Sequence, residues 1–183
     1  MTTPYAMAAS EICLPSFAEA VEKHKGMVYS IAWHVLHDRL ASEELAQDVF
    51  LQLHRNWTAI KSPEHMTFWL RKVASHRAID AARKSKAGRV TSLEEMAEPT
   101  VLERMHDAFL ASYLKRMVAS LPERQRVMVV LRYQEDMEPQ EIAKVLDMNV
   151  NTVKTQISRA LDLLRAKVSD RLGREGRKQD DAL

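Results

Sequence analysis

Residues that break or cross-link a backbone are scarce in this chain. It has one cysteine, four glycines and six prolines in 183 residues. The single cysteine, Cys13, cannot form an internal disulfide and cannot supply a cysteine-based zinc site. This cysteine usage fits a reducing compartment, and we expect the protein to act in the cytoplasm.

Long apolar runs are also missing. No stretch approaches the roughly 20 apolar residues that span a bilayer, and the N-terminal MTTPYAMAASEICLP lacks the basic start and apolar stretch of a signal peptide. Alternating apolar and polar residues, which mark strands, are rare, whereas apolar residues recur at three- and four-residue steps. The sequence therefore predicts an all-α protein.

The helical patterns fall into two groups. Residues 16–88 follow an N-terminal extension, residues 1–15, and contain three patterns, with apolar residues from Phe17 to Val35, from Leu45 to Trp57, and in a third stretch from about Glu64 to Ala82. Short connections predict that these helices form a small antiparallel bundle. A glutamate-rich linker over residues 89–106 is expected to be flexible, residues 107–170 form a second helical domain, and residues 171–183 form a disordered tail.

The second domain ends in a closely spaced pair of helices. Pro139 suits the first turn of one helix, and Asn149 suits the N-cap of the next. Only Asp147-Met148-Asn149 separates them, with Asp147 where such a turn usually has a glycine in the left-handed conformation. A short helix, a tight turn and a second helix form the helix-turn-helix arrangement, whose second helix enters the DNA major groove.

The second helix of this pair has two different faces. Val153, Ile157 and Ala160 lie on one face and are expected to be buried. The opposite face is polar and could contact bases and phosphates; it consists of Asn151, Thr152, Lys154, Thr155, Ser158 and Arg159. A solvated amphipathic helix in an ordinary bundle is the alternative interpretation.

Charge is distributed unevenly in the first domain. Glu43, Glu44 and Asp48 form an acidic cluster near the start of the second helix, where carboxylates also favour the helix dipole. The third helix and the residues after it, from Arg71 to Arg89, contain seven basic residues against one acid. Basic residues beside aromatic side chains suit melted or single-stranded DNA, although the aromatics could equally be core and the charges a solvated face.

Taken together, these residues resemble the extracytoplasmic-function (ECF) group of the sigma-70 family, the small two-domain initiation subunits of RNA polymerase. Region two of that family is similar to ASEELAQDVFLQLHRNW at 41–57 and FWLRKVASHRAIDAARK at 68–84. Region four is similar to LPERQRVMVVLRYQEDMEPQEIAKVLDMNVNTVKTQISRALDLLR at 121–165. The order and spacing of the motifs carry the resemblance; a departure is Ser75-His76, where the family commonly has an asparagine.

The resemblance implies a role for each part of the chain. Core RNA polymerase would be bound through its clamp coiled coil and flap, with the clamp contacts at Glu43, Glu44, Gln47, Asp48 and Leu51. The loop from about Thr58 to Thr67 and the third helix would bind the −10 promoter element and capture a flipped base, using Arg71, Lys72, Ser75, His76, Arg77 and Arg83. The polar face of the last helix would read the −35 element, with Arg124 and Arg126 holding phosphates.

The resemblance also implies an anti-sigma factor as regulator, and no enzymatic activity, cofactor or metal. Two other functions compete with it. A helix-turn-helix repressor or activator with an N-terminal sensing or dimerisation domain would leave the acidic and basic clusters without a role. A di-metal helical enzyme needs two Glu-x-x-His motifs, but only Glu103 and His106 form one, and His34 and His37 lack a third ligand.

Overall fold

The computed structural model describes residues 14–88, 114 and 116–180, and its regular elements are all helical. The described part therefore confirms the all-α prediction. The predicted linker and the N-terminal extension up to residue 13 lie outside the described residues. In the described part, no helix is both long enough and apolar enough to be a candidate membrane span.

The first three helices form the N-terminal bundle: α1 (Phe17–Leu36), α2 (Arg39–Arg55) and α3 (Pro63–Gly88), with a short 3-10 helix, η1 (Trp57–Ala59), before α3. Helix α1 starts at a capping box, in which the Ser16 hydroxyl accepts from the Glu19 backbone N–H and the Glu19 carboxylate accepts from that of Ser16. Helix α3 starts with Pro63 after the Ser62 hydroxyl, which accepts from the His65 backbone N–H. The helix therefore begins inside the segment that was predicted as a loop up to Thr67.

The C-terminal bundle consists of a helical stretch at 116–119 followed by α5 (Glu123–Tyr133), α6 (Pro139–Val145) and α7 (Val150–Asp180). Helix α7 continues through residues 171–180, which the sequence predicted to be disordered. Arginine, lysine, glutamate and glutamine dominate this segment. Because these residues are good helix formers and extending an existing helix needs no new nucleus, the helix continues past Gly173.

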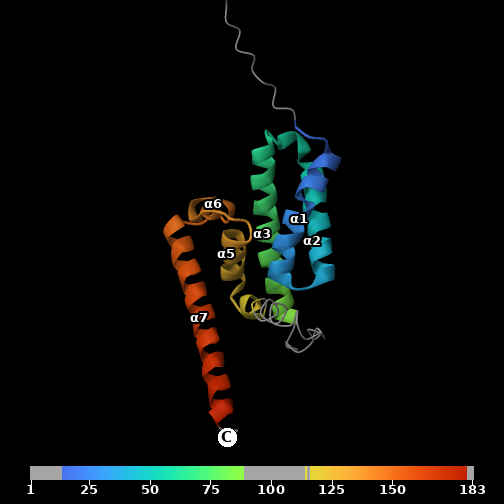
Figure 1. Ribbon diagram of the computed structural model, residues 1–183. Coiled ribbons are helices and arrows are strands. Elements are labelled where there is room, and N and C mark those ends of the chain that lie inside the picture. The colour runs from blue at the N-terminus through green and yellow to red at the C-terminus, as the bar shows by residue number, and fades with distance from the viewer. Residues whose placement is uncertain (1–13, 89–113, 115, 181–183) are drawn as a thin grey trace, which may run out of the picture.

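The two bundles pack against each other rather than standing apart. Figure 1 shows α5 lying between α3 and α7, and α5 contacts both α1 and α3. One apolar cluster includes Ile31 and Leu70 of the N-terminal bundle together with Leu131 and Ile142 of the C-terminal bundle. The described residues thus share a core that crosses the predicted domain boundary.

Candidate functional site

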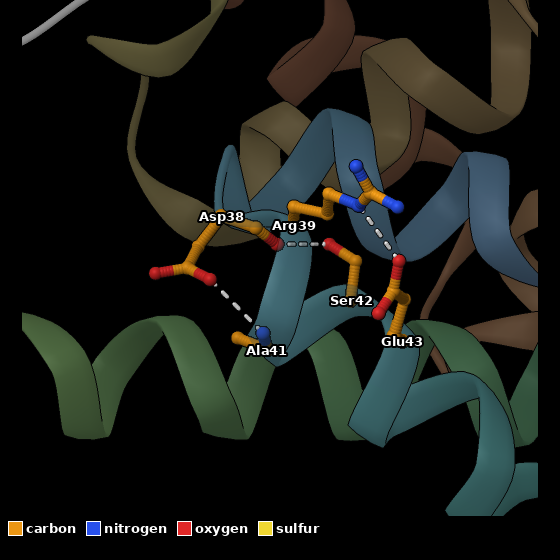
Figure 2. A network of polar contacts seen from close by, with 5 residues as sticks. All are labelled: Asp38, Arg39, Ala41, Ser42 and Glu43. Atoms are coloured by element: carbon orange, nitrogen blue, oxygen red, sulfur yellow. Dashed lines mark hydrogen bonds and ion pairs between the residues drawn. The ribbon is translucent and has the colours of Figure 1, made fainter.

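A network of polar contacts fixes the start of α2 (Figure 2). The Asp38 carboxylate accepts from the backbone N–H of Ala41 at 2.9 Å, and the Ser42 hydroxyl donates to the Asp38 carbonyl at 2.6 Å. One turn on, the Arg39 guanidinium donates to the Glu43 carboxylate at 2.8 Å. The helix start is therefore well capped, and the charge of Glu43 is matched within its own helix.

The residues predicted to bind polymerase lie along α2. Glu44 and Gln47 are exposed, and Leu51 exposes 56% of its surface. Asp48 is exposed but paired, because the Arg77 guanidinium of α3 reaches its carboxylate at 2.8 Å. An exposed leucine beside carboxylates gives α2 an outer surface with both apolar and charged character.

An apolar groove of about 760 Å³ runs between α1 and α2. Glu43, Gln47 and Leu51 line it from α2, as do Ala46 and Phe50. The α1 wall, which sequence reasoning missed, consists of Phe17, Val21, Lys25, Gly26 and Tyr29. The signal was present, since Phe17, Val21, Lys25 and Tyr29 recur at four-residue steps and so form one line along the helix.

Three residues of α3 predicted to bind the −10 element contact the C-terminal bundle. Lys72 Nζ donates to Asp147 Oδ1 at 2.7 Å, and His76 Nε2 lies 3.1 Å from the Val145 carbonyl oxygen. Arg71 Nη2 lies 3.4 Å from Glu135 Oε2. The basic face of α3 is therefore matched here by the α5–α6 connection, by the end of α6 and by the turn after α6.

The pKa values of the two carboxylates are shifted in opposite directions, although both contacts act to lower them. The hydrogen bond from Lys72 lowers the pKa of Asp147 below its usual value. Burial raises the pKa of Glu135, and the nearby Arg71 guanidinium offsets that increase only in part. The exposed pair at Asp147 is thus favourable, whereas the buried pair at Glu135 carries a desolvation cost.

A second cavity, of about 640 Å³, opens between α2 and α3. Its walls combine aromatic rings with cationic and amide groups, namely Gln52, His65, Phe68, Trp69, Lys72, Val73, His76, Arg77 and Asp80. Phe68 and Trp69 are half-buried and pack against the core, as the core alternative predicts; their contact with DNA stays a prediction.

The pair α6 and α7 has the predicted helix-turn-helix geometry. Asp147 adopts a left-handed φ of 52°, and the Met148 N–H donates to the Ala143 carbonyl at 2.9 Å, the 6→1 bond of a Schellman end. The Asn149 side-chain oxygen then accepts from the Asn151 N–H at 2.9 Å and caps α7. Asp147 therefore adopts the left-handed conformation for which this turn usually has a glycine.

The recognition face of α7 is exposed as the periodicity predicts. Val153, Ile157 and Ala160 are buried. The six polar residues opposite them, Asn151, Thr152, Lys154, Thr155, Ser158 and Arg159, are all exposed. The Thr155 hydroxyl donates to the Asn151 carbonyl at 2.8 Å, so this exposed hydroxyl can still accept a hydrogen bond.

Comparison with known families assigns both halves of the chain. Residues 20–88 match the family described as Sigma-70 region 2, and residues 111–164 match Sigma-70, region 4. The chain belongs to the sigma-70 family, in the ECF group. Region 2 coincides with α1–α3 and region 4 contains α5, α6 and the first half of α7, so we call these bundles the region-2 and region-4 domains.

Similar proteins span nearly the full chain. The ECF RNA polymerase sigma factor SigW of Bacillus subtilis is 26% identical over 168 residues, covering 85% of this chain and 90% of SigW. SigK of Mycobacterium tuberculosis is 29% identical over 157 residues, covering 82% and 84%. The fold is similar to that of the sigma factor RpoE in its complex with the anti-sigma factor NepR from Bartonella quintana, with a TM-score of 0.66, 15% identity, and 85% and 98% of the two chains covered.

Two residues of this sigma factor that were predicted to contact DNA, Ser75 and Arg126, do not face solvent where the two bundles pack together. Ser75 is completely buried, because α3 turns it towards the core of the region-2 domain. The Arg126 guanidinium donates to three backbone carbonyls, those of Val35, Ala119 and Leu121, and burial lowers its pKa. Arg126 therefore joins α1 to the start of the region-4 domain rather than facing outward.

The remaining predicted DNA contacts, and the residues considered for the competing di-metal enzyme, are placed as follows. Arg83 and Arg124 are exposed, on α3 and α5. In the described part of the sigma factor, no three His, Cys, Asp or Glu side chains come together as metal ligands would. His34 Nδ1 instead lies 2.8 Å from the Ser30 carbonyl oxygen of its own helix. Glu103 and His106 lie outside the described residues.

Proposed function

We propose that this sigma factor binds core RNA polymerase through the α1–α2 groove, reads the −35 element with α7 and the −10 element with α3, and helps open the DNA. The observation that carries the proposal is the recognition face of α7, where six exposed polar residues lie opposite a fully apolar buried side. A face of this kind, held at the end of a helix-turn-helix, suits the major groove.

The groove supports a helical protein partner. Its apolar walls, which include the exposed Leu51, can cover the apolar side of a partner helix, while the neighbouring Glu44, which is exposed, attracts basic residues. Buried apolar contacts would hold the complex, and the charges would mainly guide encounter and register. A clamp coiled coil of the polymerase is the partner we assign to this groove.

The α3 face supports contact with opened DNA. Lys72, His76 and Arg77 line the cavity between α2 and α3 beside Phe68 and Trp69. Cationic groups can hold the phosphates of a separated strand, and aromatic faces can stack with an unpaired base. Extruding a base costs a few kcal/mol, so a pocket that accepts only certain bases would couple sequence reading to strand opening.

Regulation by an anti-sigma factor is part of the proposal. The solved neighbour RpoE forms a complex with the anti-sigma factor NepR. We assign to this chain a partner of the same class, which would cover the groove on α1 and α2 and so compete with polymerase.

Transcription with purified core polymerase tests the proposed function. A pool of promoter fragments should yield discrete run-off transcripts only when both the core enzyme and this chain are present. A repressor or activator would instead protect DNA from cleavage without the polymerase. Substituting Lys154 and Arg159 by alanine should shift or abolish the promoter preference, whereas the same transcripts at the same yield would refute −35 reading by α7.

A further inference from the structure

The region-2 domain covers one side of α5. Five consecutive residues of this helix, Val127 to Leu131, each expose at most 7% of their surface. A helix at the surface of a small domain normally keeps one face in water, and burial all round means that it is covered on two sides. Helix α7 covers one side of α5, and α1 and α3 cover the other.

The polar contacts of this interface fall on the face of α3 that we assign to the −10 element. Lys72 and His76 both face the turn of the helix-turn-helix, where Asp147 Oδ1 lies 2.7 Å from Lys72 Nζ and Asp147 Oδ2 lies 3.7 Å from His76 Nε2. The Val145 carbonyl oxygen lies 3.1 Å from the same histidine nitrogen. Two side chains suited to phosphates are therefore occupied from within the molecule.

The turn after α6 presents negative charge to α3, as the phosphates of DNA would. Asp147 brings a carboxylate, and the last carbonyls of α6 carry the partial negative charge of a helix C-terminus. Glycine is the residue that best fits a left-handed turn, but it would bring no charge. Aspartate at φ 52° meets the conformational need and also places an anion against Lys72.

We propose that Asp147 is the anionic part of an internal latch: it occupies Lys72 and His76, so that packing of the region-4 domain on α3 competes with binding of the −10 DNA strand. The inference rests on the proposed function, since it takes the α3 face to be a DNA-binding surface. Opening of the two domains is then a required step before promoter binding, and free protein is held back from DNA.

The chain contains a matched control for this residue. Asp136 is also an exposed aspartate with a positive φ, 51°, in the connection between α5 and α6. Asparagine tolerates the left-handed region as well as aspartate does, so Asp147→Asn and Asp136→Asn each remove one charge without new backbone strain. Only the first substitution removes the charge that faces Lys72.

Two measurements on the full chain test the latch. Dyes on Lys23→Cys and Ala166→Cys, in a Cys13→Ser background, report the separation of the domains by energy transfer. Fluorescence anisotropy with a single-stranded DNA pool of random sequence reports access to the basic face. Asp147→Asn should lower energy transfer and tighten DNA binding by about two- to fivefold, the range expected for one exposed ion pair, while Asp136→Asn should match the unsubstituted protein in both.

A double-substitution cycle separates the latch from a general loss of folding. Lys72→Met, read by energy transfer alone, should open the domains as far as Asp147→Asn does, and the double variant should open them no further, because the two side chains form one interaction. Thermal unfolding followed by circular dichroism should show that every variant is folded.

Distinct results would overturn the inference. Equal energy transfer in Asp147→Asn and Asp136→Asn would refute the latch even if the protein binds DNA and directs transcription. Domain opening without tighter DNA binding would refute the competition. A chain that binds no single-stranded DNA in any of these variants would refute the competition but not the proposed function, which the run-off assay with core polymerase tests separately.

Discussion

The groove between α1 and α2 leads to a quantitative prediction about Leu51. This side chain exposes 56% of its surface at the edge of the groove. Fully burying a leucine contributes about 1.5–3 kcal/mol, so covering the exposed part in a complex contributes about 1–1.5 kcal/mol. Leu51→Ala should therefore weaken binding to core polymerase roughly five- to twelvefold.

Leu40 provides the control on the same helix. It exposes 75% of its surface near the start of α2 and does not line the groove, so Leu40→Ala should leave the affinity unchanged. Binding is measured by competition against a labelled copy of the protein for purified core polymerase. Thermal unfolding should be nearly the same for both variants, because neither leucine is buried. Equal affinities of Leu51→Ala and the unsubstituted protein would refute the assignment of the groove.

Four further predictions concern stability, and denaturant unfolding measures each of them. Gly26→Ala should raise the free energy of unfolding by about 0.5–1 kcal/mol, because alanine favours helix and its Cβ would meet no atom within 4 Å; a loss would contradict the open space there. Leu131→Ala should lower it by about 2–5 kcal/mol, since Leu131 is fully buried in the cluster that joins the domains, and a loss below this range would contradict a shared core. Arg126→Met should lower it by about 1–3 kcal/mol by leaving carbonyls without their donor, and unchanged stability would argue against the observed joint. Burial raises the pKa of the Glu135 carboxyl group in the folded protein, so the contribution of this group to stability is full at low pH and is lost as the pH rises through the folded-state pKa. The stability of the unsubstituted protein relative to Glu135→Gln should fall as the pH rises through that pKa. Parallel curves of stability against pH for the two proteins would contradict this prediction.

Local signals made much of the fold predictable. The three-helix bundle, the helix-turn-helix, the left-handed conformation of Asp147 and the N-cap at Asn149 all depend on residues close together in the chain. Each is set by apolar periodicity or by a side chain that bonds its own backbone, so a short stretch of sequence contains the necessary information. The exposed recognition face of α7 was predictable for the same reason.

The interface between the domains was not predictable in this way. Lys72 and Asp147 are 75 residues apart, and Arg126 donates to a carbonyl 91 residues away. A basic residue on a helix carries no sign of whether it faces a phosphate, a distant carboxylate or a buried carbonyl. Arg126 therefore resembled a phosphate contact in the sequence. The apolar run from Val127 to Leu131 indicates that α5 is buried on more than one side, but it does not say which helices cover it.

Run-off transcription with core polymerase is the most direct test of the central claim. Core polymerase, a promoter pool and the purified chain should together give promoter-specific transcripts that are absent when any one component is omitted, and Leu51→Ala should require a higher concentration of the chain for the same yield. Transcripts that do not depend on the chain, or DNA binding that is unaffected by polymerase, would contradict the assignment of initiation to this protein.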